Sequence, residues 1–180
     1  MAQAIVIQAY GGPEVMQLQE VASQPLARGQ VRVRHTRIGV NFHDIYVRSG
    51  AYKTLALPGT PGIEAVGVVD EVAEGVARFK RGDRVAYISA GYGTYATERV
   101  IDASELIAIP DDLSAALVAS SLLRGLTADV LIHRVAQVQA GSRVLVQAAG
   151  GGMGQILSQW ATKLGAYVIG TAGSDATAKK

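Results

Sequence analysis

Residues 144–154 constrain the fold more than any other part of the chain. They read V-L-V-Q-A-A-G-G-G-M-G, a short apolar run that leads into small residues. A helix-like segment (155–164) and a second apolar strand (166–171) follow. This order of strand, glycine-rich turn, helix and strand predicts a dinucleotide-binding βαβ unit.

The glycine-rich turn predicts contact with a pyrophosphate. A turn without side chains lets the backbone approach the phosphates, and the following helix offers free N–H groups. Gly151, Gly152, Met153 and Gly154 are the expected contacts, although Ala149 stands where the first glycine of the fingerprint usually lies. Tight packing of strand on helix also explains glycine here, but not three in succession.

The end of the second strand favours NADPH over NADH. NAD sites usually place a carboxylate there, whereas this chain has none before Asp175. Gly173 and Ser174 leave room for a 2′-phosphate. Lys179 or Lys180 would supply the opposite charge.

The first hundred residues are typical of an antiparallel barrel or sandwich, because short apolar or alternating runs are separated by turn signals. The expected strands are 4–9, 31–40, 65–72, 84–88 and 94–100. Residues 41–50 form a more helical patch between the second and third of them. Phe42, Ile45 and Tyr46 have helical spacing within it.

The pattern changes near Pro110. Asp112 or Ser114 can cap a helix over residues 115–123, and Thr127 begins another apolar segment that ends near residue 135. We therefore predict one domain over residues 1–125 and a second over 126–180. Only two strands of the second domain precede the last residue, so we expect the chain to be the front part of a longer protein.

Composition narrows the function classes. The absence of cysteine excludes disulfides and cysteine-ligated zinc. The net charge of +2 comes from scattered cations, which argues against a nucleic-acid groove. We expect that no apolar run approaches the roughly 18 residues of a membrane span, and the first residues lack a charged signal region. We therefore expect a cytoplasmic protein with no membrane partner.

Several ordered motifs resemble the medium-chain dehydrogenase/reductase superfamily. They are Y-G-G-P-E-V (10–15), G-V-N-F-H-D (39–44), P-G-I-E-A-V-G-V-V (61–69), G-D-R-V (82–85) and the glycine turn. The chain is most similar to its zinc-independent NADPH:quinone oxidoreductase, or zeta-crystallin-like, branch. The resemblance implies a mixed α/β chain. A GroES-like β-barrel would precede the start of a Rossmann doubly wound parallel sheet, and the full-length protein would be a homodimer.

The resemblance also implies a metal-free site. Zinc-dependent members use a cysteine and a histidine where this chain has Asn41 and Ile63, neither of which suits zinc. His35, His43 and His133 lack ligand spacing and are interpreted as surface or packing residues. Without a Lewis acid the site suits electrophilic acceptors, namely quinones or α,β-unsaturated carbonyls.

By resemblance, Asn41, Phe42, Asp44 and Tyr46 line the cleft for nicotinamide and substrate. The Tyr46 hydroxyl can donate to a developing oxyanion, and Tyr52 is expected nearby. Asn41, Tyr46 and Tyr52 are thus the catalytic candidates. For Phe42 we favour simple packing of the helical patch onto the barrel, and for Tyr46 we weigh packing and function equally. Asp44 is expected to cap the helix or hold a neighbouring side chain.

Other residues have two interpretations. Thr127 by resemblance opens a helix that faces the nicotinamide, yet capping alone would also place a threonine there. Glu64 is either structural or a supporting carboxylate. Arg124 either reaches the cofactor or is an exposed cation at the end of a helix. The resemblance places the lysine for the 2′-phosphate slightly earlier than Lys179 or Lys180, at the position where this chain has Thr177.

The leading hypothesis is an NADPH-dependent, zinc-independent reductase of quinones or enones. The first alternative is a non-enzymatic or RNA-binding crystallin-like protein, to which the dispersed charge gives little support. The second is a catalytically inert fragment with only part of the cofactor cleft.

Overall fold

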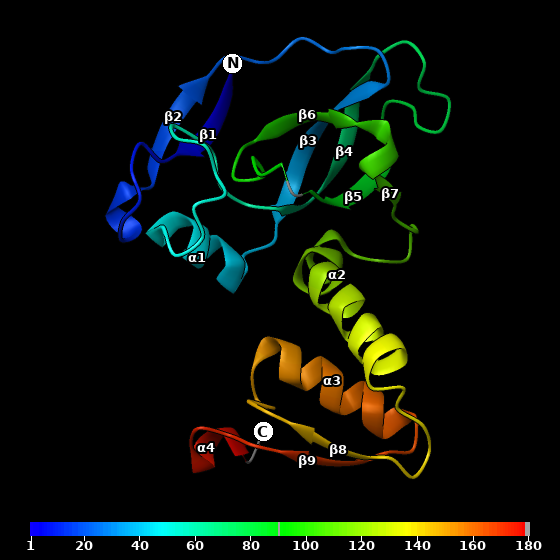
Figure 1. Cartoon of the computed structure of the whole chain (residues 1–180). Helices are drawn as coiled ribbons and strands as arrows, with labels where there is room; N and C mark the ends of the chain where they lie inside the picture. The colour runs from blue at the N-terminus through cyan, green and yellow to red at the C-terminus, as the bar shows by residue number, and fades with distance from the viewer. Residues whose placement is uncertain (90, 179–180) are drawn as a thin grey trace. The chain divides into compact units, whose positions relative to one another are not determined.

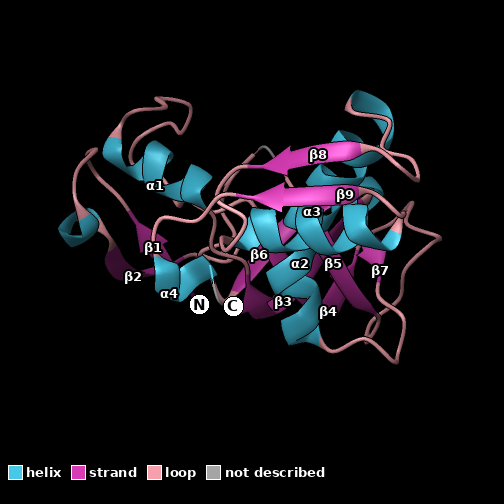
Figure 2. Cartoon of the chain, turned by 90° about the horizontal axis from the view of Figure 1, so that it is seen from below, coloured by secondary structure: helices cyan, strands magenta, loops and turns pink. Residues whose placement is uncertain are grey.

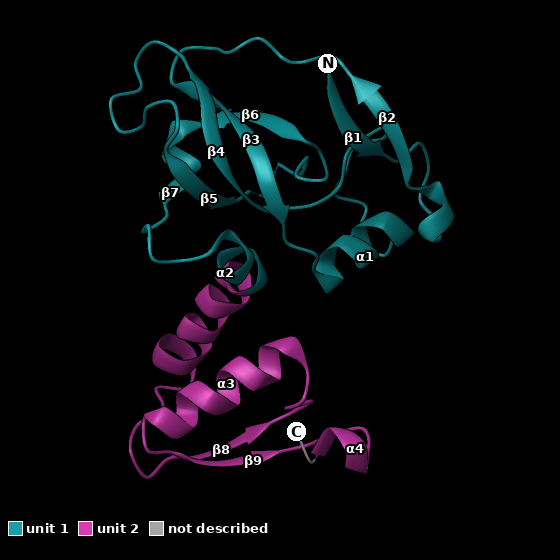
Figure 3. Ribbon diagram, turned by 180° about the vertical axis from the view of Figure 1, so that it is seen from behind, with its two compact units in different colours: residues 1–120 teal, residues 121–180 magenta. Residues whose placement is uncertain are grey.

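The computed structural model describes residues 1–89 and 91–178, which form two compact units. The first unit is Met1–Ser120 and the second is Ser121–Lys180 (Figure 3). The division lies inside one helix, whereas the sequence placed the domain boundary near Gly125. We describe each unit by itself.

The first unit contains a hairpin and a five-stranded antiparallel sheet (Figure 1). The hairpin pairs β1 (Ala2–Val6) with β2 (Gln17–Val21) around the 3₁₀ turn η1 (Pro13–Val15). The sheet has the order β6-β3-β4-β5-β7. Its strands are β3 (Gln30–Ile38), β4 (Glu64–Val72), β5 (Arg84–Ile88), β6 (Glu98–Asp102) and β7 (Ile107–Ala108), with the 3₁₀ turn η2 (Ala103–Glu105) before β7.

The sheet encloses one apolar cluster of buried residues. Its members are Val31, Val33, Ala65, Val69, Phe79, Val85, Tyr87, Ile101 and Leu106. Residues at alternate positions of β3 (Val31, Val33) and β5 (Val85, Tyr87) point into it, as the period of two in a strand requires. The predicted antiparallel β-domain is confirmed, although β2 was not predicted and β6 begins four residues later than expected.

Helix α1 (Phe42–Ser49) connects β3 to β4. It ends because Gly50 adopts the left-handed conformation (φ 82°), which glycine does without strain, and donates its N–H to the Val47 carbonyl. Asp44 and Val47, three residues apart, form its buried side. Val47 packs in a second cluster with Ile7, Leu55 and Tyr92.

The second unit contains a parallel βαβ unit (Figure 2). Strands β8 (Arg143–Val146) and β9 (Tyr167–Gly170) pair in parallel, and α3 (Gly152–Lys163) connects them. The short helix α4 (Asp175–Ala178) follows. The core holds Ile132, Val138, Ala161 and Ala166, and Trp160 packs at its edge with its ring against His133. The predicted strand, turn, helix and strand are confirmed.

Helix α2 (Ala115–Asp129) corrects the prediction of two separate helices. Ser114 caps it, since its Oγ accepts from Leu117 N at 3.1 Å. The helix then runs through Gly125 and continues as the π-helix η3 (Val130–Val135). A single glycine lowers helix propensity by only about 1 kcal/mol, which the surrounding apolar residues outweigh.

The helical stretch Ala115–Val135 also corrects the expectation that no run reaches membrane-spanning length. It has 21 residues and a mean hydropathy of 1.6 over its most apolar window, of which 17% is buried. By length and composition alone it could cross a membrane. One such helix is weak evidence, because helices of soluble proteins meet the same criteria.

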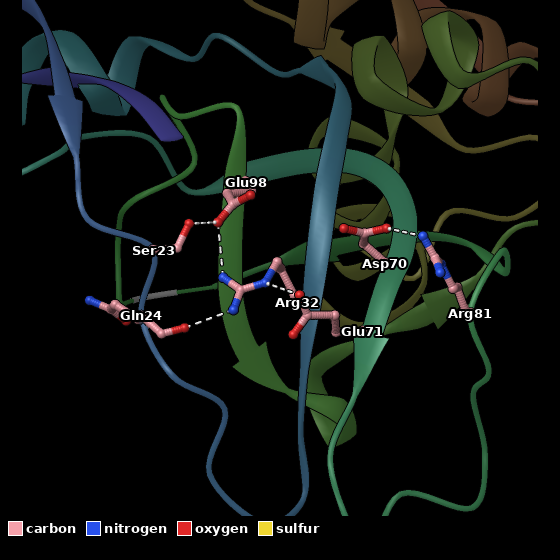
Figure 4. A network of polar contacts seen from close by, with 7 residues as sticks. All are labelled: Ser23, Gln24, Arg32, Asp70, Glu71, Arg81 and Glu98. Atoms are coloured by element: carbon pink, nitrogen blue, oxygen red, sulfur yellow. Dashed lines mark hydrogen bonds and ion pairs between the residues drawn. The ribbon is translucent and has the colours of Figure 1, made fainter. Parts of the chain in front are cut away.

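A buried arginine ties three segments of the first unit together (Figure 4). Arg32 on β3 is 8% exposed, and its Nη1 donates to Glu98 Oε1 on β6 at 2.9 Å. Its Nη2 donates to the Gln24 carbonyl at 2.9 Å, and its Nε lies 3.3 Å from Glu71 Oε1. Burial acts to lower the pKa of Arg32, but the two carboxylates outweigh burial and raise it.

Replacing Arg32 should destabilise the first unit. Arg32→Met leaves Glu98 and the Gln24 carbonyl without their shared donor, so we expect a loss of about 2–4 kcal/mol in unfolding free energy. Urea denaturation measures this loss. Arg81→Met is the matched control, because Arg81 is exposed and makes one 3.4 Å pair with Asp70. Equal losses in the two variants would contradict the prediction.

His35 gives the first unit a dependence on pH. Its Nδ1 donates to the Ala96 carbonyl at 2.7 Å, so its Nε2 accepts from the Tyr87 hydroxyl at 2.6 Å. Burial lowers the pKa of His35, against the effect of the Ala96 hydrogen bond. Burial likewise raises the pKa of Tyr87, to about 12.

Acidification should therefore destabilise this unit. The unfolded chain binds a proton at His35 before the folded chain does, so stability is present above the ordinary histidine pKa of about 6.5 and is lost as pH falls through the folded value. Unfolding free energies between pH 7.5 and 5 measure the slope. His35→Asn should reduce it, whereas His133→Asn should not. A slope that is unchanged in His35→Asn would refute the assignment.

Candidate functional site

Two buried carboxylates hold Asn41 at the start of α1. The backbone N–H of Asn41 donates to Asp44 Oδ2 at 2.9 Å. Its side-chain Nδ2 donates to Glu64 Oε2 at 2.9 Å. Asp44 is 4% exposed and Glu64 2%. Asn41 itself is half-buried, so its carboxamide is fixed from beneath and reaches the surface.

Asp44 fulfils both of its predicted roles. It caps α1, where the positive end of the helix dipole stabilises its charge, and its Oδ2 accepts from the Tyr95 hydroxyl at 2.9 Å. Burial and the neighbouring Asp44 raise the pKa of Tyr95, so this hydroxyl keeps its proton. Gly62 (φ 91°) makes room for Tyr95, since a Cβ there would lie 2.7 Å from Tyr95 Cε1.

Three exposed aromatic rings cluster at α1, two of them on the helix and that of Tyr52 just after it. The Tyr46 ring is 5.3 Å from that of Tyr52 and 6.3 Å from that of Phe42. Phe42 is 73% exposed, so the preference for packing was wrong. The reason is the helix phase: Asp44 and Val47 define the buried side, which turns Phe42, Ile45 and Tyr46 outward. The structure brings the rings of Phe42, Tyr46 and Tyr52 together, and it pairs Asn41 with Asp44 at the start of the same helix.

Behind Tyr52 lies a second aromatic pair that the sequence did not predict as part of a site. His43 stacks on Tyr92 with 6° between the ring planes, and its Nε2 lies 3.3 Å from the Tyr92 hydroxyl. The Tyr92 hydroxyl also bonds to Thr54 Oγ1. The His43 ring is 5.8 Å from Tyr52. His43 thus packs, as expected, and it supports Tyr52.

The structure adds no metal ligands to these residues. In the part of the chain that it describes, no three His, Asp or Glu side chains are grouped as ligands. Asn41 and Ile63 stand at the positions the resemblance identified. Asn41 is committed to Glu64, and Ile63 packs in the apolar cluster of α1.

Two cavities of the first unit are lined by residues other than the Asn41 group, by which we mean Asn41, Tyr46 and Tyr52. One, of about 440 Å³, is lined by Arg32, Glu98 and Arg99. The other, of about 530 Å³, is lined by Val40 and Tyr95. Asn41, Tyr46 and Tyr52 line neither cavity, so within this unit they form an open surface.

In the second unit the glycine turn connects β8 to α3. A Cβ at Gly154 would overlap the Ala148 carbonyl oxygen and lie 2.6 Å from Ala149 Cα. At Gly151 it would lie 3.1 Å from the same carbonyl, and at Gly152 3.1 Å from Arg124 Nη1. Gly154 is therefore required for packing. The other two leave a backbone surface at the N-terminus of α3, which fits a phosphate.

The end of β9 returns to the same turn. Thr177 packs against Gly150, where a Cβ would overlap its Cγ2. Ser174 Oγ accepts from Thr177 N at 3.3 Å and holds α4, while Gly173 has open space around its Cα. The assignment of Lys180, with its alternative Lys179, lies outside the described residues. Contacts of Met153, Gly173 and Ser174 with a cofactor stay predictions.

Thr127 neither opens nor caps a helix. It lies inside α2, and its Oγ1 donates to the Leu123 carbonyl one turn earlier at 2.8 Å. Because α2 does not break at Gly125, a threonine at 127 has no free N–H group to cap. Its predicted contact with the nicotinamide stays a prediction.

Sequence reasoning left the role of Glu64 undecided and did not single out Tyr95. Both lie beside Asn41 because strand pairing brings distant residues together, which no local pattern reports. The one feature of the sequence that could have indicated a close approach to this segment is Gly39, two residues before Asn41. A Cβ there would lie 2.7 Å from Glu64 Cδ.

Comparison with known proteins identifies the class. Residues 27–111 match the family model of the alcohol dehydrogenase GroES-like domain. The first unit therefore contains a GroES-like domain, which agrees with the motifs that resemble the medium-chain dehydrogenase/reductase superfamily.

Within that class the chain is homologous to quinone oxidoreductases. The one from Pseudomonas aeruginosa is 39% identical over 179 residues, 99% of this chain and 55% of that protein. A 2-haloacrylate reductase of Burkholderia sp is 42% identical over 184 residues, with the same coverages. The crystal structure of Escherichia coli quinone oxidoreductase complexed with NADPH superposes with a TM-score of 0.94 and 38% identity, covering 98% and 54% of the two chains. The chain thus spans about half the length of the curated relatives it matches.

A side chain at Gly154 should destabilise the second unit. Gly154→Ala forces the Ala148 carbonyl and α3 apart, and overpacking of this kind costs about 1–3 kcal/mol. Gly125→Ala is the control, because nothing lies within 4 Å of its Cβ position and alanine favours the helix. Thermal unfolding followed by tryptophan fluorescence measures both. A Gly154→Ala protein as stable as the control would contradict this packing.

Proposed function

We propose that the chain carries the substrate side of a reductase that uses NADPH to reduce quinones or other electron-poor α,β-unsaturated carbonyl compounds. The observation that supports this most directly is the Asn41 group. An oriented carboxamide stands at the start of α1 and two exposed tyrosine hydroxyls lie on and just after this helix, in a chain whose relatives are quinone oxidoreductases.

The donors at this surface support the proposed substrate class. When bound, NADPH supplies a hydride. The acceptor gains negative charge on oxygen, and hydrogen-bond donors stabilise that charge. Tyr46, 43% exposed, and Tyr52, 49% exposed, can donate their O–H groups, and Asn41 can donate its second amide N–H. Because these tyrosines are in contact with solvent, water supplies the proton that completes the hydroquinone.

The glycine turn supports the choice of cofactor. Gly151 and Gly152 leave backbone at the N-terminus of α3 open to a diphosphate, and Gly173 and Ser174 leave the end of β9 open to a 2′-phosphate. No carboxylate precedes Asp175 there to select a 2′-hydroxyl. The 2-haloacrylate reductase relative is consistent with acceptors that carry a conjugated double bond.

Turnover of NADPH with a panel of quinones and enones tests the proposal. We expect loss of the reduced-nicotinamide absorbance and tighter binding of NADPH than of NADH. Tyr46→Phe should lower kcat by up to about 100-fold, the lower end of what loss of one oxyanion donor costs, because Tyr52 and Asn41 still donate. Tyr167→Phe, which removes an exposed hydroxyl from β9, is the control. If no acceptor were reduced by the chain or by any longer protein that contains it, the proposal would fail.

A further inference from the structure

Glu64 lies buried beneath the surface that holds Asn41. It is the first residue of β4, where its carbonyl accepts from Gly39 N at 3.0 Å. Its side chain is covered by the segment that leaves β3, so that only 2% of the residue is exposed. A carboxylate in such a position must be held by hydrogen bonds, since burial without them is strongly unfavourable.

The bond from Asn41 to Glu64 determines how the carboxamide is turned. A carboxylate oxygen only accepts, whereas a carboxamide has one edge that donates and one that accepts. The Asn41 Nδ2, 2.9 Å from Glu64 Oε2, therefore has to face inward. The second N–H and the carbonyl oxygen of the Asn41 carboxamide then point away from Glu64, toward the exposed side of this half-buried residue.

Gly39 makes this arrangement possible. A Cβ at this position would overlap Glu64 Oε2 and lie 2.7 Å from Glu64 Cδ and 2.9 Å from Cγ. Any side chain at position 39 would thus displace the carboxylate that contacts Asn41. The glycine is required for space, and it is close to Asn41 in the chain.

We propose that Glu64 is a positioning residue of the reductase site: its carboxylate, admitted by Gly39, fixes the Asn41 carboxamide so that one N–H is presented to the substrate oxygen. This inference rests on the proposed function. It extends that function from the residues at the surface to a residue that touches no substrate. The expected benefit is orientation, because small misplacements of a donor lower rates by up to about 100-fold.

Substitution of Glu64 tests the orientation. Glu64→Ala removes the acceptor, and we expect kcat for a quinone to fall roughly 10- to 100-fold. Glu64→Gln keeps size and hydrogen bonding but can both donate and accept, so Asn41 can turn either way; we expect a smaller fall of a few fold. Glu74→Gln is the control, because Glu74 is exposed and only 3.9 Å from an exposed Arg28.

A double-mutant cycle separates positioning from a general structural effect. If Glu64 acts through Asn41, Glu64→Gln should have no further effect on kcat once Asn41→Ala is present. A purely structural role would lower kcat by the same factor in both backgrounds, and that additivity would overturn the proposal.

Gly39→Ala gives the same test without changing the carboxylate. We expect its kcat to fall as in Glu64→Ala, because the methyl group displaces the Glu64 side chain. If Gly39→Ala does not fold, Glu64→Gln, which changes one atom type, still decides the matter.

A measurement independent of activity distinguishes failure of this inference from failure of the proposed function. The side-chain amide of Asn41 in a ¹⁵N-labelled protein should show one proton shifted downfield by the carboxylate, and Glu64→Gln should reduce that shift. Should quinones not be reduced while this resonance responds, the reductase proposal is wrong and the orientation of Asn41 by Glu64 stands. An Asn41 resonance that is unaffected by Glu64→Gln would overturn the inference whatever the activity.

Discussion

The pairing of β3 with β4 is the constraint on which the rest of the first unit depends. These strands are antiparallel with Ile38 opposite Ala65, so the chain that leaves β3 runs beside the first residue of β4. The hydrogen bond from Gly39 N to the Glu64 carbonyl extends this pairing by one step. Asn41 and Glu64, far apart in sequence, become neighbours for that reason alone. A slip of one residue would turn the Glu64 side chain to the other face of the sheet.

The two units use glycine for different purposes. Gly39 and Gly62 in the first unit leave space for side chains, namely the Glu64 carboxylate and the Tyr95 ring. In the second unit, Gly154 lets α3 approach the Ala148 carbonyl, whereas Gly151 and Gly152 leave backbone uncovered. A sequence pattern reports that glycine is present but not which of these it serves. The atoms that surround each glycine decide which purpose it serves.

Local patterns were sufficient for the βαβ unit, for α1 and for four strands of the main sheet, because apolar periodicity and turn residues act within a few positions. They failed where tertiary packing decided. The break expected at Gly125 did not occur, Phe42 faced outward once Asp44 and Val47 occupied the inner side of α1, and Thr127 lay inside a helix. Asn41, Tyr46 and Tyr52 were predicted through resemblance. The hydrogen bond that links Asn41 to Glu64 is non-local and was not predicted.

The placement of Trp160 has a practical consequence. It is the single tryptophan of the chain and lies in the second unit, edge-on to His133 at 5.5 Å between ring centroids. Of the seven tyrosines, only Tyr167 shares that unit. Tryptophan fluorescence therefore reports on the folding of the second unit, and tyrosine fluorescence reports mainly on that of the first. The chain thus carries two intrinsic spectroscopic reporters, one for each half, without any added label.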